Sequence, residues 1–171
     1  MSTDLFRAAI ISSTTLVAAA TATATNITCN GAADGMAIAN ATTGITPYTY
    51  AWDDPGNQTT QTAIGLLIGT YTVTVTDAFG CFMIATTAAI TEPSAIVLST
   101  SSTDATCGNA DGSISTGVIG GVAPYQIGWS TGDTVPDISN LVAGNYALNI
   151  ADANGCLTTE YYNVSDENGP N

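Results

Sequence analysis

Four cysteines are the residues best placed to do chemistry in this chain of 171 residues. The spacing from Cys29 to Cys81 is close to the spacing from Cys107 to Cys156, so one pattern occurs twice. Four cysteines allow three disulfide connectivities, and only pairing within each half keeps the symmetry of the pattern. We therefore predict one disulfide between Cys29 and Cys81 and another between Cys107 and Cys156. Buried free thiols are the alternative.

Few other residues offer catalytic or metal-binding groups. The sequence has no histidine, a single basic residue and no Cys-x-x-Cys pair, so a zinc site is not expected. Two acidic pairs, Asp53 with Asp54 and Asp133 with Asp137, have the residue types needed for general acid and base catalysis. Both pairs stand in loops containing Gly, Pro or Thr, where solvated turns are the simpler interpretation. No catalytic residue is predicted, and the chain is expected not to be an enzyme.

Calcium is the one metal ion for which the acidic residues are candidate ligands, because it prefers carboxylate oxygens. The candidates are Asp34, Asp53, Asp54 and Asp77 in the first half and Asp111, Asp133, Asp137 and Asp152 in the second. They do not follow the Asp-x-Asp-x-Asp-Gly spacing of a dedicated calcium loop. The prediction is that the protein uses no metal and no cofactor, with Ca²⁺ as the alternative.

The cysteine pattern belongs to a longer internal repeat. Cys29 opens Cys-Asn-Gly-Ala-Ala-Asp-Gly, and Cys107 opens Cys-Gly-Asn-Ala-Asp-Gly. Each opening is followed by a Pro-Tyr segment that ends in Trp52 or Trp129, and later by a segment that ends in Asp-Ala-x-Gly-Cys. Equivalent positions recur with a period of roughly 75 residues, so the chain is a tandem repeat of one structural unit.

The segments between these landmarks alternate apolar and polar residues as β-strands do. The alternation covers residues 48–52 and 71–76 in the first copy, and 125–129 and 146–150 in the second. Turn residues separate them, and no segment has a helical period. Short, regularly spaced strands of this kind indicate immunoglobulin-like β-sandwiches. We predict an all-β chain of two tandem sandwiches, each with one disulfide beside a core tryptophan.

The expected domains are residues 18–93 and 94–171, preceded by an extended N-terminal arm at residues 1–17. Ala8-Ala9-Ile10 in the arm matches Ala88-Ala89-Ile90 at the end of the first repeat. We predict that the arm adds as a strand to the sheet of a neighbouring copy. The residues expected to make that contact are Leu5, Phe6, Ala8, Ile10 and Ile11. The alternatives are an arm that folds back on its own domain, the tail of a preceding repeat, or a secretion signal.

Composition excludes several classes of function. One basic residue against 14 acidic residues gives a net charge of −13, which excludes nucleic acid as a partner. A hydrophobic content of 45% argues against disorder. The sequence has no apolar stretch long enough to cross a membrane as a helix, so membrane insertion is not expected. The predicted disulfides require an oxidising compartment, and we expect an extracellular location at the cell surface.

Taken together, these motifs resemble the SprB-type repeat. The resemblance rests on Cys-Asn-Gly-x-x-Asp-Gly, Pro-Tyr-x-Tyr-x-Trp, Tyr-x-Val-x-Val-x-Asp-x-x-Gly-Cys and Ile-Thr-Glu-Pro, and it covers residues 25–168 in two copies. The second copy departs from it at Cys107-Gly-Asn and ends in Asn-Val-Ser-Asp-Glu. Such repeats occur in arrays in large secreted surface proteins of Bacteroidetes, including a gliding-motility adhesin. The resemblance implies an extracellular, non-catalytic adhesive or structural module and names no ligand.

The predicted function is that of a structural subunit of an extracellular cell-surface filament, similar to a fimbria or pilus. Its partner is a second copy of itself, joined by strand donation from the N-terminal arm. The alternative is a repeat fragment of a long surface adhesin that binds glycans or surfaces through its loops. A secreted carbohydrate-active enzyme is a third class.

Overall fold

The computed structural model describes residues 19–167, and every regular element in that range is a β-strand. The chain divides into two compact units. Of the described residues, the first unit holds 19–24, 37–64 and 70–89, and the second holds 25–36, 65–69 and 90–167. The units do not coincide with the repeats, because three short segments of the first repeat, residues 25–36, 65–69 and 90–93, belong to the second unit.

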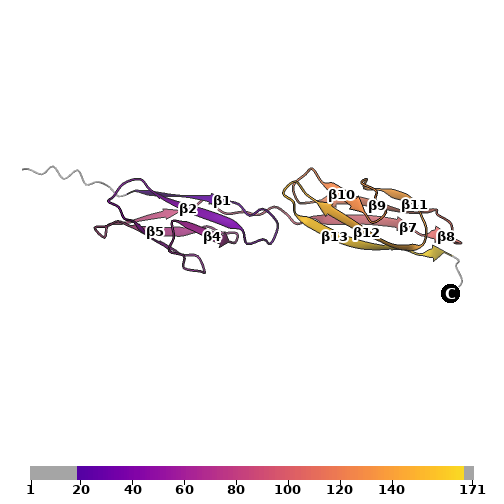
Figure 1. Ribbon diagram of the computed structural model, residues 1–171, viewed down its shortest axis with the longest axis horizontal. Coiled ribbons are helices and arrows are strands. Elements are labelled where there is room, and N and C mark those ends of the chain that lie inside the picture. The colour runs from indigo at the N-terminus through magenta and orange to yellow at the C-terminus, as the bar shows by residue number, and fades with distance from the viewer. Residues whose placement is uncertain (1–18, 168–171) are drawn as a thin grey trace, which may run out of the picture. The chain divides into compact units, whose positions relative to one another are not determined.

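The strands of the first repeat form two three-stranded sheets (Figure 1). One sheet has the order β1-β2-β4 and consists of β1 (Ala20–Thr25), β2 (Gly35–Ala41) and β4 (Thr62–Leu66). The other has the order β3-β5-β6 and consists of β3 (Thr49–Trp52), β5 (Thr72–Thr76) and β6 (Phe82–Thr86). The pairings within the second sheet are antiparallel.

The second repeat has the same arrangement. One sheet has the order β7-β9-β11 and consists of β7 (Val97–Thr103), β9 (Gly112–Ile119) and β11 (Ile138–Leu141). The other has the order β10-β12-β13 and consists of β10 (Gln126–Trp129), β12 (Gly144–Ala151) and β13 (Leu157–Val164). Two further short strands, β8 (Ala105–Thr106) and β14 (Asp166–Glu167), pair in parallel.

Strand order identifies the fold of each repeat. The first, second and fourth main strands make one sheet, and the third, fifth and sixth make the other. This is the division of strands A, B and E from strands C, F and G in the immunoglobulin sandwich, here without strand D. The prediction of two tandem immunoglobulin-like β-sandwiches is confirmed.

Alternate side chains of the strands build the core. In β5, Val73 and Val75 are fully buried, while the threonines that alternate with them remain partly exposed. In β12, Leu148 and Ile150 are fully buried in the same way. Burying an aliphatic side chain of this size contributes about 1.5–3 kcal/mol relative to leaving it exposed. The two-residue period seen in the sequence therefore decides which face of each strand joins the core.

One tryptophan lies in the core of each repeat, as predicted. Trp52 is 3% exposed and Trp129 is 5% exposed. The indole N–H of Trp52 donates to the Thr60 carbonyl at 2.9 Å, and that of Trp129 donates to the Val135 carbonyl at 2.9 Å. Because both indole donors are satisfied, these residues bury their large rings without leaving a polar group unpaired.

The turn before the last main strand of each repeat is organised by an aspartate. The Asp152 carboxylate accepts hydrogen bonds from the backbone N–H groups of Val122, Asn154 and Cys156 at 2.9, 2.8 and 2.9 Å. Gly155 supplies the left-handed residue of this turn, with φ at 81°. The turn therefore fixes the backbone of Cys156, which stands immediately before β13.

The first repeat contains the same turn. The Asp77 carboxylate accepts from the N–H groups of Ile45, Phe79 and Cys81 at 3.2, 2.9 and 2.9 Å. Gly80 has φ at 80°. Cys81 is therefore held immediately before β6 as Cys156 is held before β13.

These hydrogen bonds set the acidity of the turn aspartates. Burial raises the pKa of Asp152, but the N–H groups of Cys156, Val122 and Asn154 outweigh that effect and hold the pKa below its ordinary value. The pKa of Asp77 is lowered by the same balance of burial against backbone N–H donors. A carboxyl group whose folded pKa is depressed stabilises the fold above its unfolded pKa, and this contribution is lost as the pH falls through the folded pKa.

Truncating either core tryptophan is expected to destabilise its repeat strongly. Trp52→Ala or Trp129→Ala should cost about 3–5 kcal/mol in unfolding free energy, because each removes a large buried ring and leaves a cavity. Urea denaturation followed by circular dichroism measures the loss. Tyr161→Ala is the matched control, since Tyr161 is exposed and its removal should change stability by less than about 0.5 kcal/mol. A tryptophan variant as stable as the parent would contradict the core assignment.

Asp152→Asn is expected to lower the melting temperature at pH 7, because the amide cannot accept three N–H donors as the carboxylate does. The difference from the parent should shrink as the pH falls below about 3.9, the ordinary pKa of aspartate, since the parent then protonates its own carboxyl group. Thermal melts between pH 7 and pH 2 test this. Asp133→Asn, at an exposed aspartate whose carboxylate accepts from the Thr131 hydroxyl, is the control. A difference that stays constant with pH would contradict the assignment.

Candidate functional site

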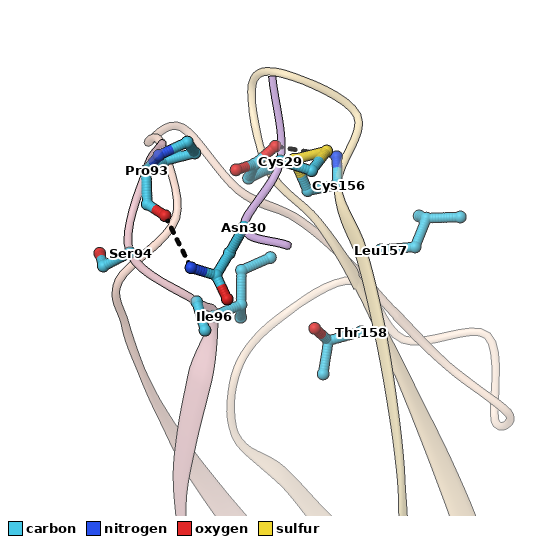
Figure 2. Close-up of a pocket in the computed structure, with 10 residues that line it drawn as sticks. Cys29, Asn30, Pro93, Ser94, Ile96, Cys156, Leu157 and Thr158 are labelled. Atoms are coloured by element: carbon cyan, nitrogen blue, oxygen red, sulfur yellow. Dashed lines mark hydrogen bonds between the residues drawn. A yellow bond between two sulfur atoms is a disulfide. The ribbon is translucent and has the colours of Figure 1, made fainter. Parts of the chain in front are cut away.

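One disulfide is present among the four cysteines, and it joins Cys29 to Cys156 (Figure 2). Their Cα atoms are 5.6 Å apart. Cys81 and Cys107 are free thiols, and both are exposed. The predicted pairings of Cys29 with Cys81 and of Cys107 with Cys156 are therefore wrong, and so is the expectation of one disulfide in each sandwich.

The position of the last main strand explains this correction. In the second repeat, Cys156 stands immediately before β13, whereas the N–H of Cys107 donates to the Glu167 carbonyl beyond the other end of that strand, at 3.3 Å. β13 has 8 residues, so the two ends are on the order of 26 Å apart. A disulfide requires Cα atoms within about 7 Å. The two cysteines of one repeat are therefore too far apart to bond.

Aliphatic side chains occupy the core positions that a cystine would take. In an immunoglobulin sandwich, the second cysteine of the core disulfide stands two residues after a conserved tyrosine of strand F. That tyrosine corresponds to Tyr146 here, whose hydroxyl donates to the Val142 carbonyl at 2.7 Å. Leu148 stands two residues later and is fully buried. Val73 stands in the same relation to Tyr71 in the first repeat, so neither core contains sulfur at this position.

The loop that carries Cys29 is held against Glu92 and Pro93, which form the joint at the boundary between the two expected domains. The amide of Asn30 donates to the Glu92 carboxylate and to the Pro93 carbonyl, both at 3.1 Å. The N–H of Gly31 donates to the same carboxylate at 2.7 Å. Glu92 and Pro93 are therefore tied to the cysteine loop as well as linking consecutive repeats along the chain.

The backbone beside Cys29 also meets the turn that carries Cys156. The side-chain amide of Asn154 donates to the Thr28 carbonyl at 2.8 Å, and the Cys156 sulfur lies 3.4 Å from the same oxygen. Thr28 is fixed in turn by Asp34, which accepts from the Thr28 hydroxyl and, at 3.1 Å, from its N–H. These hydrogen bonds lower the pKa of Asp34, and the one from the Thr28 hydroxyl has the largest effect. The disulfide is thus supported by polar contacts on both sides.

A pocket of about 190 Å³ lies beside this disulfide, and its residues all belong to the second compact unit. In Figure 2, the side chain of Asn30 points between the segment of Ser94 and Ile96 and the strand that carries Leu157 and Thr158. The pocket is smaller than the range of about 300–1,000 Å³ typical of sites for drug-sized ligands. Its one acidic lining residue, Asp152, is already engaged by backbone N–H groups. The arrangement is suited to holding two segments together.

The acidic residues considered as calcium ligands or catalytic pairs accept hydrogen bonds from their own loops or from neighbouring strands. The buried carboxylate of Asp54 accepts from the N–H groups of Gly56 and Gln58, both at 2.9 Å, and Asp53 accepts from the Thr72 N–H at 2.7 Å. Asp137 accepts hydrogen bonds from β9. Within residues 19–167, no three His, Cys, Asp or Glu side chains gather in a group that suits a metal ion. Calcium binding therefore stays an untested alternative.

The residues predicted for the polymerisation arm, Leu5, Phe6, Ala8, Ile10 and Ile11, lie outside the described residues. The arm therefore remains a prediction. Within residues 19–167, no helix is long and apolar enough to span a membrane.

Sequence reasoning missed a group of exposed apolar side chains around the last strand of the first repeat. Phe79 is 79% exposed, Phe82 is 67% exposed and Ile84 is 61% exposed. The signal was available, because Phe82 and Ile84 alternate with the buried residues Met83 and Ala85. Large apolar side chains that gather on the surface are typical of contact sites.

The SprB repeat model matches the chain at two places, residues 21–57 and 99–134. Both matches begin in the first main strand of a repeat and extend beyond its core tryptophan. Among curated proteins, none matches the chain in sequence.

Several solved structures are similar to the chain at low identity. Murine CEACAM1b is 14% identical over 87% of this chain and 100% of its own, with a TM-score of 0.32. The amphioxus IgVJ-C2 molecule is 10% identical over 72% of this chain and 91% of its own, with a TM-score of 0.33. A tetra-tandem repeat in the extending region of a large adhesion protein is 18% identical over 87% of this chain and 50% of its own, with a TM-score of 0.27. Because these scores are low, the fold assignment rests on strand order. The motifs and the family model agree, since the SprB repeat model matches the chain once in each of its two tandem repeats.

Proposed function

We propose that this chain is a structural subunit of an extracellular cell-surface filament, built from SprB repeats and assembled by strand donation from its N-terminal arm. The observation that carries a structural role is the disulfide between Cys29 and Cys156. It links the opening loop of the first repeat to the last turn of the second, rather than closing a loop within one sandwich. Covalent linkage between consecutive repeats suits a protein that must transmit tension along its length.

Three features support an extracellular and non-enzymatic role. The two matches to the SprB repeat support a surface adhesin-like repeat protein. Disulfides persist in oxidising environments outside the cytosol. The acidic pair Asp53 and Asp54, considered for acid and base chemistry, is engaged by backbone N–H groups. A carboxylate held in this way serves the fold of its loop.

The arm would add at the edge of a sheet, because each repeat already has all six main strands of its sandwich. The match between Ala8-Ala9-Ile10 and Ala88-Ala89-Ile90 supports burial of Ile10 when the arm adds to a sheet. In the copy that the structure describes, Ile90 is buried and pairs with Gly69 through two backbone hydrogen bonds of 2.7 and 3.1 Å. An equivalent Ala-Ala-Ile segment from a neighbouring subunit would gain backbone pairing of this kind at the edge of a sheet, together with burial of its isoleucine.

Deleting residues 1–16 is expected to leave two folded sandwiches that no longer form filaments. Circular dichroism tests folding, and electron microscopy tests assembly. Ile10→Asp should also abolish assembly, because burying an unpaired carboxylate is costly. Ala9→Asp is the matched control, since Ala9 alternates with Ile10 and would face away from the acceptor sheet. Normal filaments from the deletion variant would overturn strand donation.

A repeat fragment of a long adhesin is the second candidate function. A shallow groove on the outer face of the β10-β12-β13 sheet favours this second function. Gln126 and Asn149 flank Gly128 in the groove. The space above Gly128 is open, because a Cβ built there would meet no neighbouring atom. Amide side chains beside an open floor are suited to hydrogen bonding with a sugar. Isolated particles in electron microscopy, together with glycan binding that Asn149→Ala removes, would favour this function over the filament.

A further inference from the structure

The two free cysteines occupy the same positions in their repeats as the two bonded cysteines. Cys107 opens the second repeat as Cys29 opens the first, and Cys81 ends the last turn of the first repeat as Cys156 ends that of the second. One cysteine of each type is bonded, and one of each type is exposed and free. The chain therefore carries both halves of a second disulfide of the same kind.

The half that contains Cys81 matches the bonded half at Cys156 in its hydrogen bonds. Each cysteine N–H donates to its turn aspartate at 2.9 Å. Each aspartate N–H donates back to the cysteine carbonyl, at 3.0 Å from Asp77 and at 3.1 Å from Asp152. The turn thus presents Cys81 on a backbone of the same form as the one that presents Cys156.

The half that contains Cys107 matches the bonded half at Cys29. The residue before Cys107, Thr106, bonds through its N–H and its hydroxyl to Asp111, as Thr28 bonds to Asp34. The loop then reaches an acidic residue that follows the last main strand. The N–H of Gly108 donates to Asp166 at 3.2 Å, where the N–H of Gly31 donates to Glu92.

The two loops differ at one point. From its threonine to its aspartate, the second loop is one residue shorter than the first. Cys107 has a positive φ of 47°, and Gly108 follows with φ at 72°. Despite this difference, the hydrogen bonds to Asp111 and Asp166 hold the loop on both sides of the cysteine.

We propose that Cys81 of one copy and Cys107 of a second copy form a disulfide, which repeats between chains the bond that Cys29 and Cys156 form within one chain. This inference deepens the assembly step of the proposed function, although it does not involve the N-terminal arm. Because the two partners are different residues, the linked pair keeps one free thiol of each type after the first bond forms, Cys107 on one copy and Cys81 on the other. Contact of this heterologous kind extends into an open chain rather than closing as a symmetric dimer.

Exposed aromatic residues beside Cys81 support a second copy as the partner. Phe79 and Phe82 flank this thiol, at the positions that Asn154 and Leu157 hold beside Cys156. Asn154 meets the loop of Cys29 through the Thr28 carbonyl. A second copy docked at Cys81 would cover the exposed phenylalanine rings and so remove apolar surface from water.

The bond forms by two thiol–disulfide exchanges with a small disulfide oxidant such as oxidised glutathione. The thiolate of Cys81 attacks the oxidant, forms a mixed disulfide and releases one reduced thiol. The thiolate of Cys107 from the second copy then attacks the Cys81 sulfur, forms the protein disulfide and releases the second reduced thiol. Two protein thiols are oxidised, one oxidant molecule is reduced to two thiols, and the two protons go to the products. The same chemistry is available with Cys107 attacking first.

The test uses the full chain incubated with oxidised and reduced glutathione at about pH 8, where thiolates react readily. Under non-reducing electrophoresis the parent should give a ladder of multimers that dithiothreitol removes. Cys81→Ser and Cys107→Ser should each stay almost entirely monomeric. An equal mixture of the two variants should give a dimer at least about ten times more abundant than in either alone, with no higher species.

Mapping the linked peptides identifies the bond. Trypsin cleaves after basic residues, and the chain has only one, so the protein is cleaved at aspartate instead. The expected product joins Cys81 to Cys107 and comes only from multimers. Equal dimer formation by each single variant, no multimers from the parent, or the same cross-linked peptide from monomers would overturn the proposal.

The arm deletion separates this inference from the proposed function. The variant that lacks residues 1–16 should still form the disulfide ladder, because both cysteines remain. A ladder from a parent that forms no filaments would support the disulfide and reject the filament. Filaments from the double variant Cys81→Ser and Cys107→Ser, with no ladder from the parent, would reject the disulfide and leave the filament standing.

Discussion

The carboxylate at the start of the last turn is the interaction on which each repeat depends. It collects three backbone N–H groups from two segments of the chain, and one of the three belongs to a cysteine. The turn cannot relax without leaving several donors unsatisfied, which is costly in a part-buried site. The position of Cys81 or Cys156 is therefore set by electrostatics within the sandwich, before any sulfur chemistry takes place.

The tandem repeat allows these cysteines to form disulfides between repeats. Each repeat places one cysteine before its last strand and the other beyond that strand, too far apart to bond to each other. A cysteine of this kind has to find its partner in a different repeat, as Cys29 and Cys156 do. The loop of Cys29, the joint at Glu92 and the turn of Cys156 then form one hydrogen-bonded cluster.

Much of the fold was predictable from the sequence, because alternating burial is a local property of a strand. The tandem repeat, the all-β class and the buried tryptophans Trp52 and Trp129 all follow from spacing and period. The disulfide was not predictable in the same way, because similar spacings within each repeat concealed which end of the last strand each cysteine occupies. Asp-Ala-x-Gly-Cys did indicate a turn directly before a strand. Combining that turn with strand order would have placed the two cysteines of one repeat at opposite ends of the last main strand. The exposed residues Phe79 and Phe82 were missed because Phe79 lies in the turn before β6 and Phe82 alternates with the core residues of that strand.

Val73 and Leu148 are aliphatic residues at the positions of a core cystine, and they change the order of folding and disulfide formation in this protein. A sandwich whose core needs no sulfur can fold while every thiol is still reduced, so its maturation does not wait for an oxidant. Oxidation then acts on finished surfaces, and the bonds that form are chosen by which surfaces meet rather than by which cysteines are nearest along the chain. In such a protein the redox state of the surroundings controls connection between modules, while the integrity of each module is left to its packing.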